Sequence, residues 1–147
     1  LFNWLGQTLE GKDCLDVFAG SGALGFEAAS RHARAVVMLE KDARAFRGLE
    51  RSALVLGARN VELRQGDGLE YRPRGRRFDV VFLDPPYASG LLAVALRLAR
   101  GCLADGGVVY AENGEPLDPG PEWSVWKAGR AGSVHFYLLR AVNEEAR

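Results

Sequence analysis

Short apolar runs of the kind that form buried strands alternate along this chain with longer segments of helical pattern. The runs are dense in Val, Leu and Phe, which is typical of strands covered on both faces by helices. We expect strands at 14–18, 35–40, 61–65, 78–83 and 107–112, and helices at 24–31, 42–56 and 91–103. The connections are long enough for right-handed crossovers, so the pattern predicts an α/β fold, a doubly wound Rossmann-like sheet of mostly parallel strands.

The pattern changes after Glu112. Three prolines interrupt the following segment, and two alternating runs, 123–128 and 133–140, then flank the glycine-containing stretch 129–132. Alternating runs about a short glycine turn predict a C-terminal antiparallel hairpin at the end of the sheet. Because several families share such a sheet, the fold alone does not identify a function.

The size and composition of the chain limit its organisation. A length of 147 residues with 48% apolar residues predicts one domain with a single core. Cys14 and Cys102 lie far apart in apolar runs, which favours buried thiols in a reducing compartment, so we expect a cytoplasmic protein. No apolar run is long enough to cross a bilayer. The formal net charge of +0 leaves contacts with nucleic acid to local basic groups.

A glycine-rich turn joins the first expected strand to the first expected helix. In the sequence DVFAGSGALG, three glycines follow the G-x-G-x-x-G spacing of nucleotide-binding turns, namely Gly20, Gly22 and Gly25. Glycines let a ligand approach the backbone, and the helix N-terminus adds N–H donors and a positive dipole. Glu40 ends the next strand about 20 residues later, where a carboxylate can bind two ribose hydroxyls; a solvated strand-end charge is the alternative.

Asp16 distinguishes between the ligands that such a turn binds. Its carboxylate would repel a pyrophosphate but attract the ammonium and sulfonium groups of S-adenosylmethionine, which we therefore expect as the cofactor. Asp67 follows the third strand and either accepts a hydrogen bond from the adenine amino group or forms an Asx turn. The predicted cofactor-binding residues are Asp16, Phe18, Ala19, Gly20, Gly22, Glu40, Lys41, Asp67 and Gly68.

The fourth expected strand leads directly into Asp84-Pro85-Pro86-Tyr87 at the same edge of the sheet. The prolines stiffen this turn and can leave the Asp84 carboxylate and the Pro85 carbonyl facing one point. Two acceptors at one point suit an exocyclic base amine, which becomes nucleophilic when both of its protons are held. Tyr87 is expected to stack on the base. We expect Asp84, Pro85, Pro86 and Tyr87 to be catalytic; a rigid strand-ending turn is the alternative.

The chain resembles the RsmD family of bacterial methyltransferases over nearly its whole length. The matching motifs are Leu1-Phe2-Asn3-Trp4-Leu5, the run 15–25, the tetrapeptide at 84–87, Tyr110-Ala111-Glu112 and the hairpin at 123–139. The tetrapeptide alone is shared with DNA and protein glutamine methyltransferases, whereas the start and the hairpin are more specific. The resemblance implies methylation of a guanine N2 in 16S ribosomal RNA, with Asp84 and Tyr87 holding the guanine. The expected partner is ribosomal RNA or the small ribosomal subunit.

Members of this family usually begin with a basic segment, so we expect the domain at 1–147 to lack a short N-terminal piece that helps to bind RNA. The remaining candidates for phosphate contacts are Arg72, Arg74, Arg76, Arg77, Lys127 and Arg130, with a solvated loop as the alternative for each. Neither His32 nor His135 has a partner at metal-ligand spacing, so we expect no metal, and we expect a monomer without membrane association.

Three other functions stay open at this point. A nicotinamide-dependent oxidoreductase can use the same glycine turn. A DNA or protein amino-methyltransferase can carry the same tetrapeptide. A non-catalytic RNA-binding module can retain the cofactor pocket.

Overall fold

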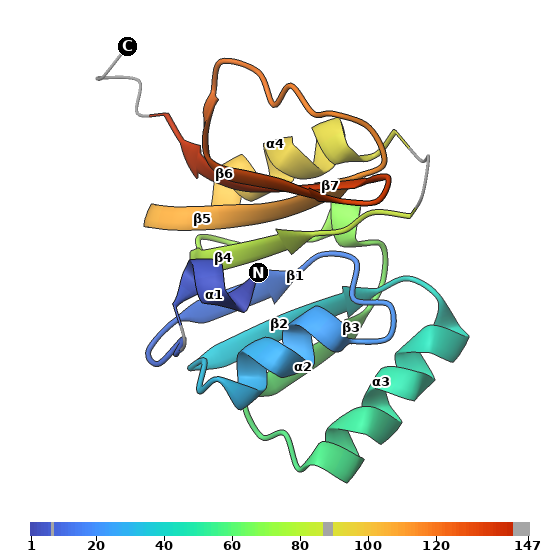
Figure 1. Ribbon diagram of the computed structural model, residues 1–147. Helices are drawn as coiled ribbons and strands as arrows, with labels where there is room; N and C mark the ends of the chain where they lie inside the picture. The colour runs from blue at the N-terminus through green and yellow to red at the C-terminus, as the bar shows by residue number, and fades with distance from the viewer. Residues whose placement is uncertain (7, 87–89, 143–147) are drawn as a thin grey trace.

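The computed structural model describes residues 1–6, 8–86 and 90–142, which form one mixed sheet of seven strands in the order β3-β2-β1-β4-β5-β7-β6 (Figure 1). The parallel part consists of β1 (Asp13–Asp16), β2 (Ala35–Glu40), β3 (Val61–Gln65), β4 (Phe78–Leu83) and β5 (Leu103–Asn113). Strand β7 (Val134–Ala141) is antiparallel to both β5 and β6 (Trp123–Ala131). The predicted doubly wound sheet with a terminal hairpin is therefore confirmed.

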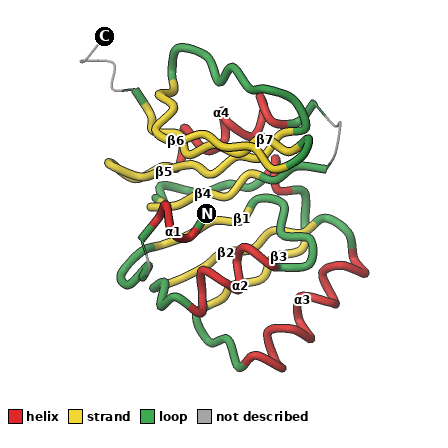
Figure 2. Tube along the Cα trace, in the orientation of Figure 1, coloured by secondary structure: helices red, strands yellow, loops and turns green. Residues whose placement is uncertain are grey.

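Helices cover both faces of this sheet (Figure 2). On one face α1 (Phe2–Leu5), α2 (Ala23–Ser30) and α3 (Ala43–Leu56) contribute to a cluster that contains Cys14, Val36 and Phe82. On the other face α4 (Leu92–Cys102) packs on Leu15 and Val81. Successive strand residues alternate between the two clusters, as expected for a sheet that is buried on both sides. In the part of the chain that is described, no helix is long and apolar enough to cross a membrane.

Local signals explain where the elements begin and end. The bounds of β2, β3 and β4 are those predicted, and α3 begins directly after Asp42, whose side chain accepts a hydrogen bond from the Ala45 N–H at 2.8 Å. Helix α2 is shifted by one residue toward the N-terminus, and α4 is one residue shorter at each end than predicted.

The other four strands differ from their predicted bounds, and β7 does so only by a shift of one residue toward the C-terminus. The first strand ends at Asp16, so Phe18 lies in the glycine turn. Strand β5 begins at Leu103, four residues before the predicted start, because Leu103 pairs with Phe78 beyond a register shift. Strand β6 continues to Ala131 because pairing with β7 extends to Val134, and a tight turn through Gly132, with φ of +61°, replaces the longer turn that was expected.

The register places Asp16 and Asp84 close together at one edge of the sheet. Asp16 at the end of β1 pairs with Phe82 of β4, and Leu83 pairs with Ala111 of β5. Asp84 therefore leaves β4 between the ends of β1 and β5, because the carboxyl ends of parallel strands meet at the same edge of a sheet.

Candidate active site

A cavity of about 570 Å³ opens at the carboxyl edge of the parallel strands, and this volume is in the range typical of small-molecule sites. The turns that follow β1, β2, β3 and β4 all contribute to its wall. The predicted residues that line it are Asp16, Phe18, Ala19, Gly20, Glu40, Lys41, Asp67, Gly68, Asp84, Pro85 and Pro86. Tyr87, the fourth residue of the predicted catalytic tetrapeptide, lies outside the described residues.

Gly22 does not line the cavity. It is the N-cap of α2 with φ of +88°, and a Cβ placed on it would lie 2.4 Å from the Phe26 ring. Gly22 is thus required by the packing of the helix N-terminus and by its backbone conformation. In contrast, a Cβ on Gly20 would meet no other atom within 4 Å, because Gly20 faces the open cavity.

Asp16 is the most deeply buried charged group of the cavity, with 1% of its surface exposed. Among the described residues, its Oδ1 is the buried side-chain oxygen that has no hydrogen-bond partner. Burial raises the pKa of Asp16 to about 7, and the Asp84 carboxylate contributes in the same direction, against hydrogen bonds from the Gly25 and Phe18 backbone. A cationic donor in the cavity would supply both the missing hydrogen bond and the compensating charge.

Glu40 is held at the rim of the cavity by two backbone donors. The Gly20 N–H donates to Oε1 and the Asp42 N–H donates to Oε2, each at 2.8 Å. Because each carboxylate oxygen accepts two hydrogen bonds, Glu40 retains capacity for two hydroxyl groups of a ligand. These contacts also fix the direction of its carboxylate before a ligand binds.

Asp67 has a structural role through one of its oxygens. Its Oδ1 accepts a hydrogen bond from the Leu69 N–H at 3.0 Å and so caps the short helix η1 (Gly68–Glu70), which is the Asx-turn arrangement. Its side chain also lines the cavity, and its contact with adenine stays a prediction.

Gly68 brings η1 directly against the end of β1. A Cβ at this position would lie 2.1 Å from the Val17 carbonyl oxygen, which is backbone and cannot move aside. Gly68→Ala is expected to destabilise the protein by about 1 to 3 kcal/mol in denaturant unfolding, because the strand and η1 would be forced apart. Gly101→Ala in α4 is the matched control, since nothing lies within 4 Å of that added Cβ. Equal stability of the two variants would contradict this close approach.

A second cavity of about 190 Å³ adjoins the first. Asp84, Pro85, Pro86 and Leu91 line both cavities, so the rigid turn after β4 forms the boundary between them. Partial burial raises the pKa of Asp84 to about 6, and the neighbouring Glu112 adds to this through its charge and a hydrogen bond. The Tyr110 hydroxyl donates to Glu112 Oε1 at 2.5 Å.

Sequence reasoning did not assign a role to Glu112. The available signal was its place in the motif Tyr110-Ala111-Glu112 near the end of an expected strand, but the pairing of this strand with β4 is needed to place it beside Asp84. Ser21, Leu39 and Leu69 also line the larger cavity without having been predicted.

The charge of the larger cavity selects between cofactors. Four carboxylates line it, from Asp16, Glu40, Asp67 and Asp84, against one ammonium group, that of Lys41. Such a wall repels the pyrophosphate of a dinucleotide and suits the cationic S-adenosylmethionine. The residues present therefore fit this cofactor.

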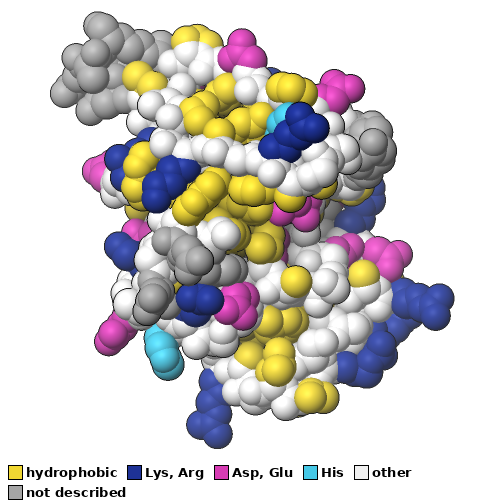
Figure 3. Space-filling view, viewed as in Figure 1, with side chains coloured by type: hydrophobic (Ala, Val, Ile, Leu, Met, Phe, Trp, Pro, Cys, Tyr) yellow, Lys and Arg dark blue, Asp and Glu magenta, His cyan; other side chains and the backbone are white. Residues whose placement is uncertain are grey.

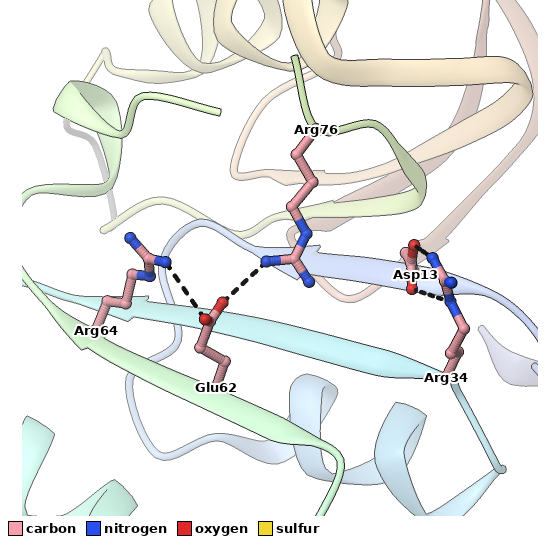
Figure 4. A network of polar contacts seen from close by, with 5 residues as sticks. All are labelled: Asp13, Arg34, Glu62, Arg64 and Arg76. Carbon is pink, nitrogen blue, oxygen red and sulfur yellow. Dashed lines mark hydrogen bonds and ion pairs between the residues drawn. The ribbon is translucent and has the colours of Figure 1, made fainter. Parts of the chain in front are cut away.

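The arginines expected to contact phosphate are partly engaged within the protein. Figure 4 shows Arg76 and Arg64 pointing at Glu62 from either side, with Arg76 Nη1 donating to the carboxylate at 3.0 Å. The same view shows the ion pair between Arg34 and Asp13, which lies where β1 and β2 begin. Arg77 Nη1 donates to the Gly101 carbonyl at 2.8 Å. Both Arg76 and Arg77 precede β4 and so lie toward the edge opposite Asp84.

Lys127 and Arg130 belong to the hairpin. Arg130 Nε donates to the Gly132 carbonyl at 2.8 Å, and Lys127 Nζ lies 5.1 Å from the centre of the Trp126 ring. In Figure 3 the basic side chains occur in separate groups around this face and do not form one continuous patch. Phosphate contacts by Lys127 and Arg130 stay a prediction.

Comparison with known proteins agrees with this geometry. A family described as Conserved hypothetical protein 95 matches residues 1–140. The ribosomal RNA small subunit methyltransferase D of Escherichia coli (strain K12) is 37% identical over 147 residues, which cover 95% of this chain and 74% of that protein. The Haemophilus influenzae protein of the same name is 35% identical over 149 residues, covering 95% and 77% of the two chains.

Solved structures give the same result. A putative methyltransferase from Escherichia coli superimposes with a TM-score of 0.87 at 33% identity, covering 95% of this chain and 81% of that one. A putative methylase from Haemophilus influenzae gives a TM-score of 0.85 at 34% identity, with 97% and 94% covered. These matches favour a methyltransferase over the oxidoreductase alternative. The chain therefore belongs to the family described as Conserved hypothetical protein 95, which is the RsmD family of methyltransferases.

Proposed function

We propose that this protein transfers a methyl group from S-adenosylmethionine to the N2 amino group of a guanine in small-subunit (16S) ribosomal RNA. The observation that carries the proposal is the position of Asp84 and Pro85 between an acidic cavity of cofactor size and a smaller cavity. The substrate is supported by the relatives, which are ribosomal RNA small subunit methyltransferases.

In the larger cavity Asp16 accepts a hydrogen bond from the ammonium group, Glu40 binds the ribose hydroxyls and Asp67 binds the adenine amino group. S-adenosylmethionine supplies a methyl group already activated on a positively charged sulfur. The work left to the protein is therefore to position the acceptor nitrogen and to stabilise the charge that develops on it.

Asp84 carries out that work in the proposed reaction. Its carboxylate and the Pro85 carbonyl accept hydrogen bonds from the two amino protons and orient the nitrogen toward the larger cavity. The cofactor would supply the methyl group, and the amino nitrogen that accepts it would become positively charged beside the Asp84 carboxylate. Asp84 accepts the proton that the nitrogen then releases, and its pKa of about 6 suits an acceptor working near neutral pH.

The proposal includes a cytoplasmic monomer built as one domain. Cys14 and Cys102 are free and buried, which fits a reducing compartment. Charged side chains on the outer strands, Arg64 on β3 and Lys127 on β6, discourage edge-to-edge pairing with another chain. A single species of monomer mass in light scattering is the expected result, and a stable dimer would contradict it.

The decisive experiment maps the methylation of 16S ribosomal RNA by mass spectrometry in cells with and without the gene for this protein. One N2-methylguanine is expected to disappear on deletion and to return when the wild-type gene is supplied. An unchanged pattern of N2-methylguanine excludes the proposed substrate. Calorimetry with S-adenosylhomocysteine and with NADH provides an independent check of the cofactor, since tight binding of NADH alone would overturn it.

A further inference from the structure

Glu112 has no task in the reaction described above, although it lies beside the residue that performs it. It follows Ala111, which pairs with Leu83, so Glu112 and Asp84 occupy equivalent places on neighbouring parallel strands. Both side chains line the second cavity. Asp84 and Pro85 line both this cavity and the larger, cofactor-sized one, so a base in the second cavity would lie next to the cofactor site.

The carboxylate of Glu112 is held by a hydrogen bond from Tyr110, a residue of the same strand. Tyr110 lies two residues earlier and therefore on the same side of β5, and its hydroxyl donates to Glu112 Oε1 at 2.5 Å. The Tyr110 ring is itself buried and contacts Phe82 of β4 edge-on, with 6.5 Å between ring centres. A carboxylate fixed by a buried phenol is a preorganised acceptor, because its direction is set before a ligand arrives.

The wall of the second cavity offers hydrogen-bond acceptors next to one another. Asp84 and Glu112 both line it, and so does Pro85, whose carbonyl the proposed function uses as a further acceptor. The Watson–Crick edge of guanine carries the complementary pattern, with the N1–H donor next to the N2 amino group. Adenine presents a lone pair at N1, as cytosine does at N3, and this lone pair would be repelled by the oxygens of ionised Glu112. Glu112 and Asp84 share a hydrogen bond in the free protein, so the discrimination applies once that shared proton has left and both groups are ionised.

The unpartnered oxygen of Asp16 lines the larger cavity, where it would hold the cationic end of the cofactor. The reacting nitrogen must lie between the two cavities, next to Asp84. A guanine placed with its amino group there directs N1–H along the wall toward β5, where Glu112 is located.

We propose that Glu112 accepts the N1–H of the target guanine while Asp84 holds its amino group, so that Glu112 determines the selectivity of the enzyme for guanine. This inference rests on the proposed function and adds to it the residue that recognises the base. Tyr110 is a positioning residue in this arrangement, because it acts through Glu112.

The test uses small ribosomal subunits reconstituted around 16S ribosomal RNA in which the methylated position carries guanine or 2-aminopurine. The analogue 2-aminopurine keeps the exocyclic amine but has a lone pair in place of N1–H. For the wild-type enzyme, kcat/KM is expected to be about 10 to 100 times higher with guanine. Equal rates for the two bases in the wild-type enzyme would overturn the inference, since N1–H would then not be read.

The variant Glu112→Gln tests whether the Glu112 side chain is responsible for the preference for guanine. With Tyr110 still donating to Oε1, the amide N–H₂ faces the base, where it repels the N1–H of guanine and matches the lone pair of 2-aminopurine. The preference for guanine is expected to fall about 10-fold or more, mainly through a slower reaction with guanine. Affinity for S-adenosylhomocysteine is expected to stay unchanged, because Glu112 does not line the larger cavity.

The matched control is Glu115→Gln, which removes the same charge from an exposed residue outside both cavities and is expected to keep the wild-type preference. If Glu112→Gln loses S-adenosylhomocysteine binding, Tyr110→Phe decides the question. Tyr110→Phe removes the hydrogen bond that holds Glu112, so the preference for guanine over 2-aminopurine is expected to fall in that variant. An unchanged preference would count against the inference.

Failure of base recognition by Glu112 and failure of the proposed function give different experimental results. Methylation of guanine with an unchanged base preference in Glu112→Gln overturns this inference alone. If wild-type enzyme leaves guanine-containing subunits unmethylated, the proposed function fails and the inference with it.

Discussion

Asp84→Ala is expected to lower the rate of methyl transfer about 100- to 1000-fold or more, while S-adenosylhomocysteine still binds. The Asp84 carboxylate accepts a hydrogen bond from the amino group, stabilises the positive charge that develops on nitrogen and takes up the released proton. The methyl side chain of alanine can do none of these. Binding survives because the contacts assigned to the cofactor come from Asp16, Glu40 and Asp67, on other strands. Single-turnover rates and calorimetry on the same preparation separate the two effects.

The matched control for Asp84 is Asp105→Ala, which removes an exposed carboxylate near the start of β5, at the opposite edge of the sheet. It is expected to retain wild-type turnover. Wild-type turnover in Asp84→Ala would contradict the assignment of a catalytic role to the tetrapeptide.

The rate should also depend on pH through the same group. The ionised carboxylate is the active form, and the pKa of Asp84 is raised to about 6 by partial burial and by Glu112. We expect the rate to fall up to about tenfold per pH unit as the pH drops below 6, and to level off above it. Asp84→Asn is expected to be slow and to lack this pH-dependent limb. A wild-type profile without change between pH 5 and 7 would contradict the assignment.

The arrangement of the site was largely predictable because it depends on one rule of topology. The apolar runs that became β2 and β4 are bounded by polar residues, so their ends, and hence the positions of Glu40 and Asp84, were clear from the sequence. Once the strands are parallel, their carboxyl ends share one edge, and Asp16 joins the same cavity.

The positions of two residues relative to the cavities could not be predicted from the sequence. Gly22 fits the glycine spacing as well as Gly20 does, but the spacing does not tell a glycine that faces a ligand from one that packs against Phe26. Glu112 becomes a neighbour of Asp84 only through the register of β5 on β4, and that register includes a shift after Phe78 which no local pattern reveals.

Asp16→Asn is expected to weaken binding of S-adenosylhomocysteine about 100-fold or more. The ligand's ammonium group loses its buried charged partner, and the neutral amide also presents N–H donors that repel it. Glu40 and Asp67 do not compensate, because they lie at the ends of different strands. Calorimetry measures the change, and Asp105→Asn, at an exposed residue outside the cavity, is the control expected to bind normally.

The affinity of the wild-type protein should itself depend on pH. A cationic ligand prefers ionised Asp16, whose pKa in the free protein is raised to about 7, first by burial and then by Asp84. Affinity is therefore expected to rise with pH, by at most about tenfold per unit, until the pH exceeds 7. In Asp16→Asn this contribution disappears, and an equally steep profile in the variant would show that another group is responsible.

The same substitution should have the opposite effect on the stability of the free protein. The pKa of Asp16 is about 7 when folded, against an ordinary value near 3.8, so below pH 4 the group is neutral in both states and no buried charge opposes folding. Between pH 4 and 7 the unfolded chain releases the proton while the folded chain retains it, so the stability of the wild-type protein falls by up to about 1.4 kcal/mol per pH unit. Asp16→Asn is expected to unfold at a higher temperature than wild type at pH 8 and at a similar temperature at pH 4. Saturating S-adenosylhomocysteine should make wild type unfold at a higher temperature than Asp16→Asn at pH 8, because the ammonium group of the ligand pairs with a carboxylate and not with an amide. A variant that is less stable than wild type at pH 8 without ligand would show that Asp16 is already compensated within the protein, and the case for a cationic cofactor at this position would then fail.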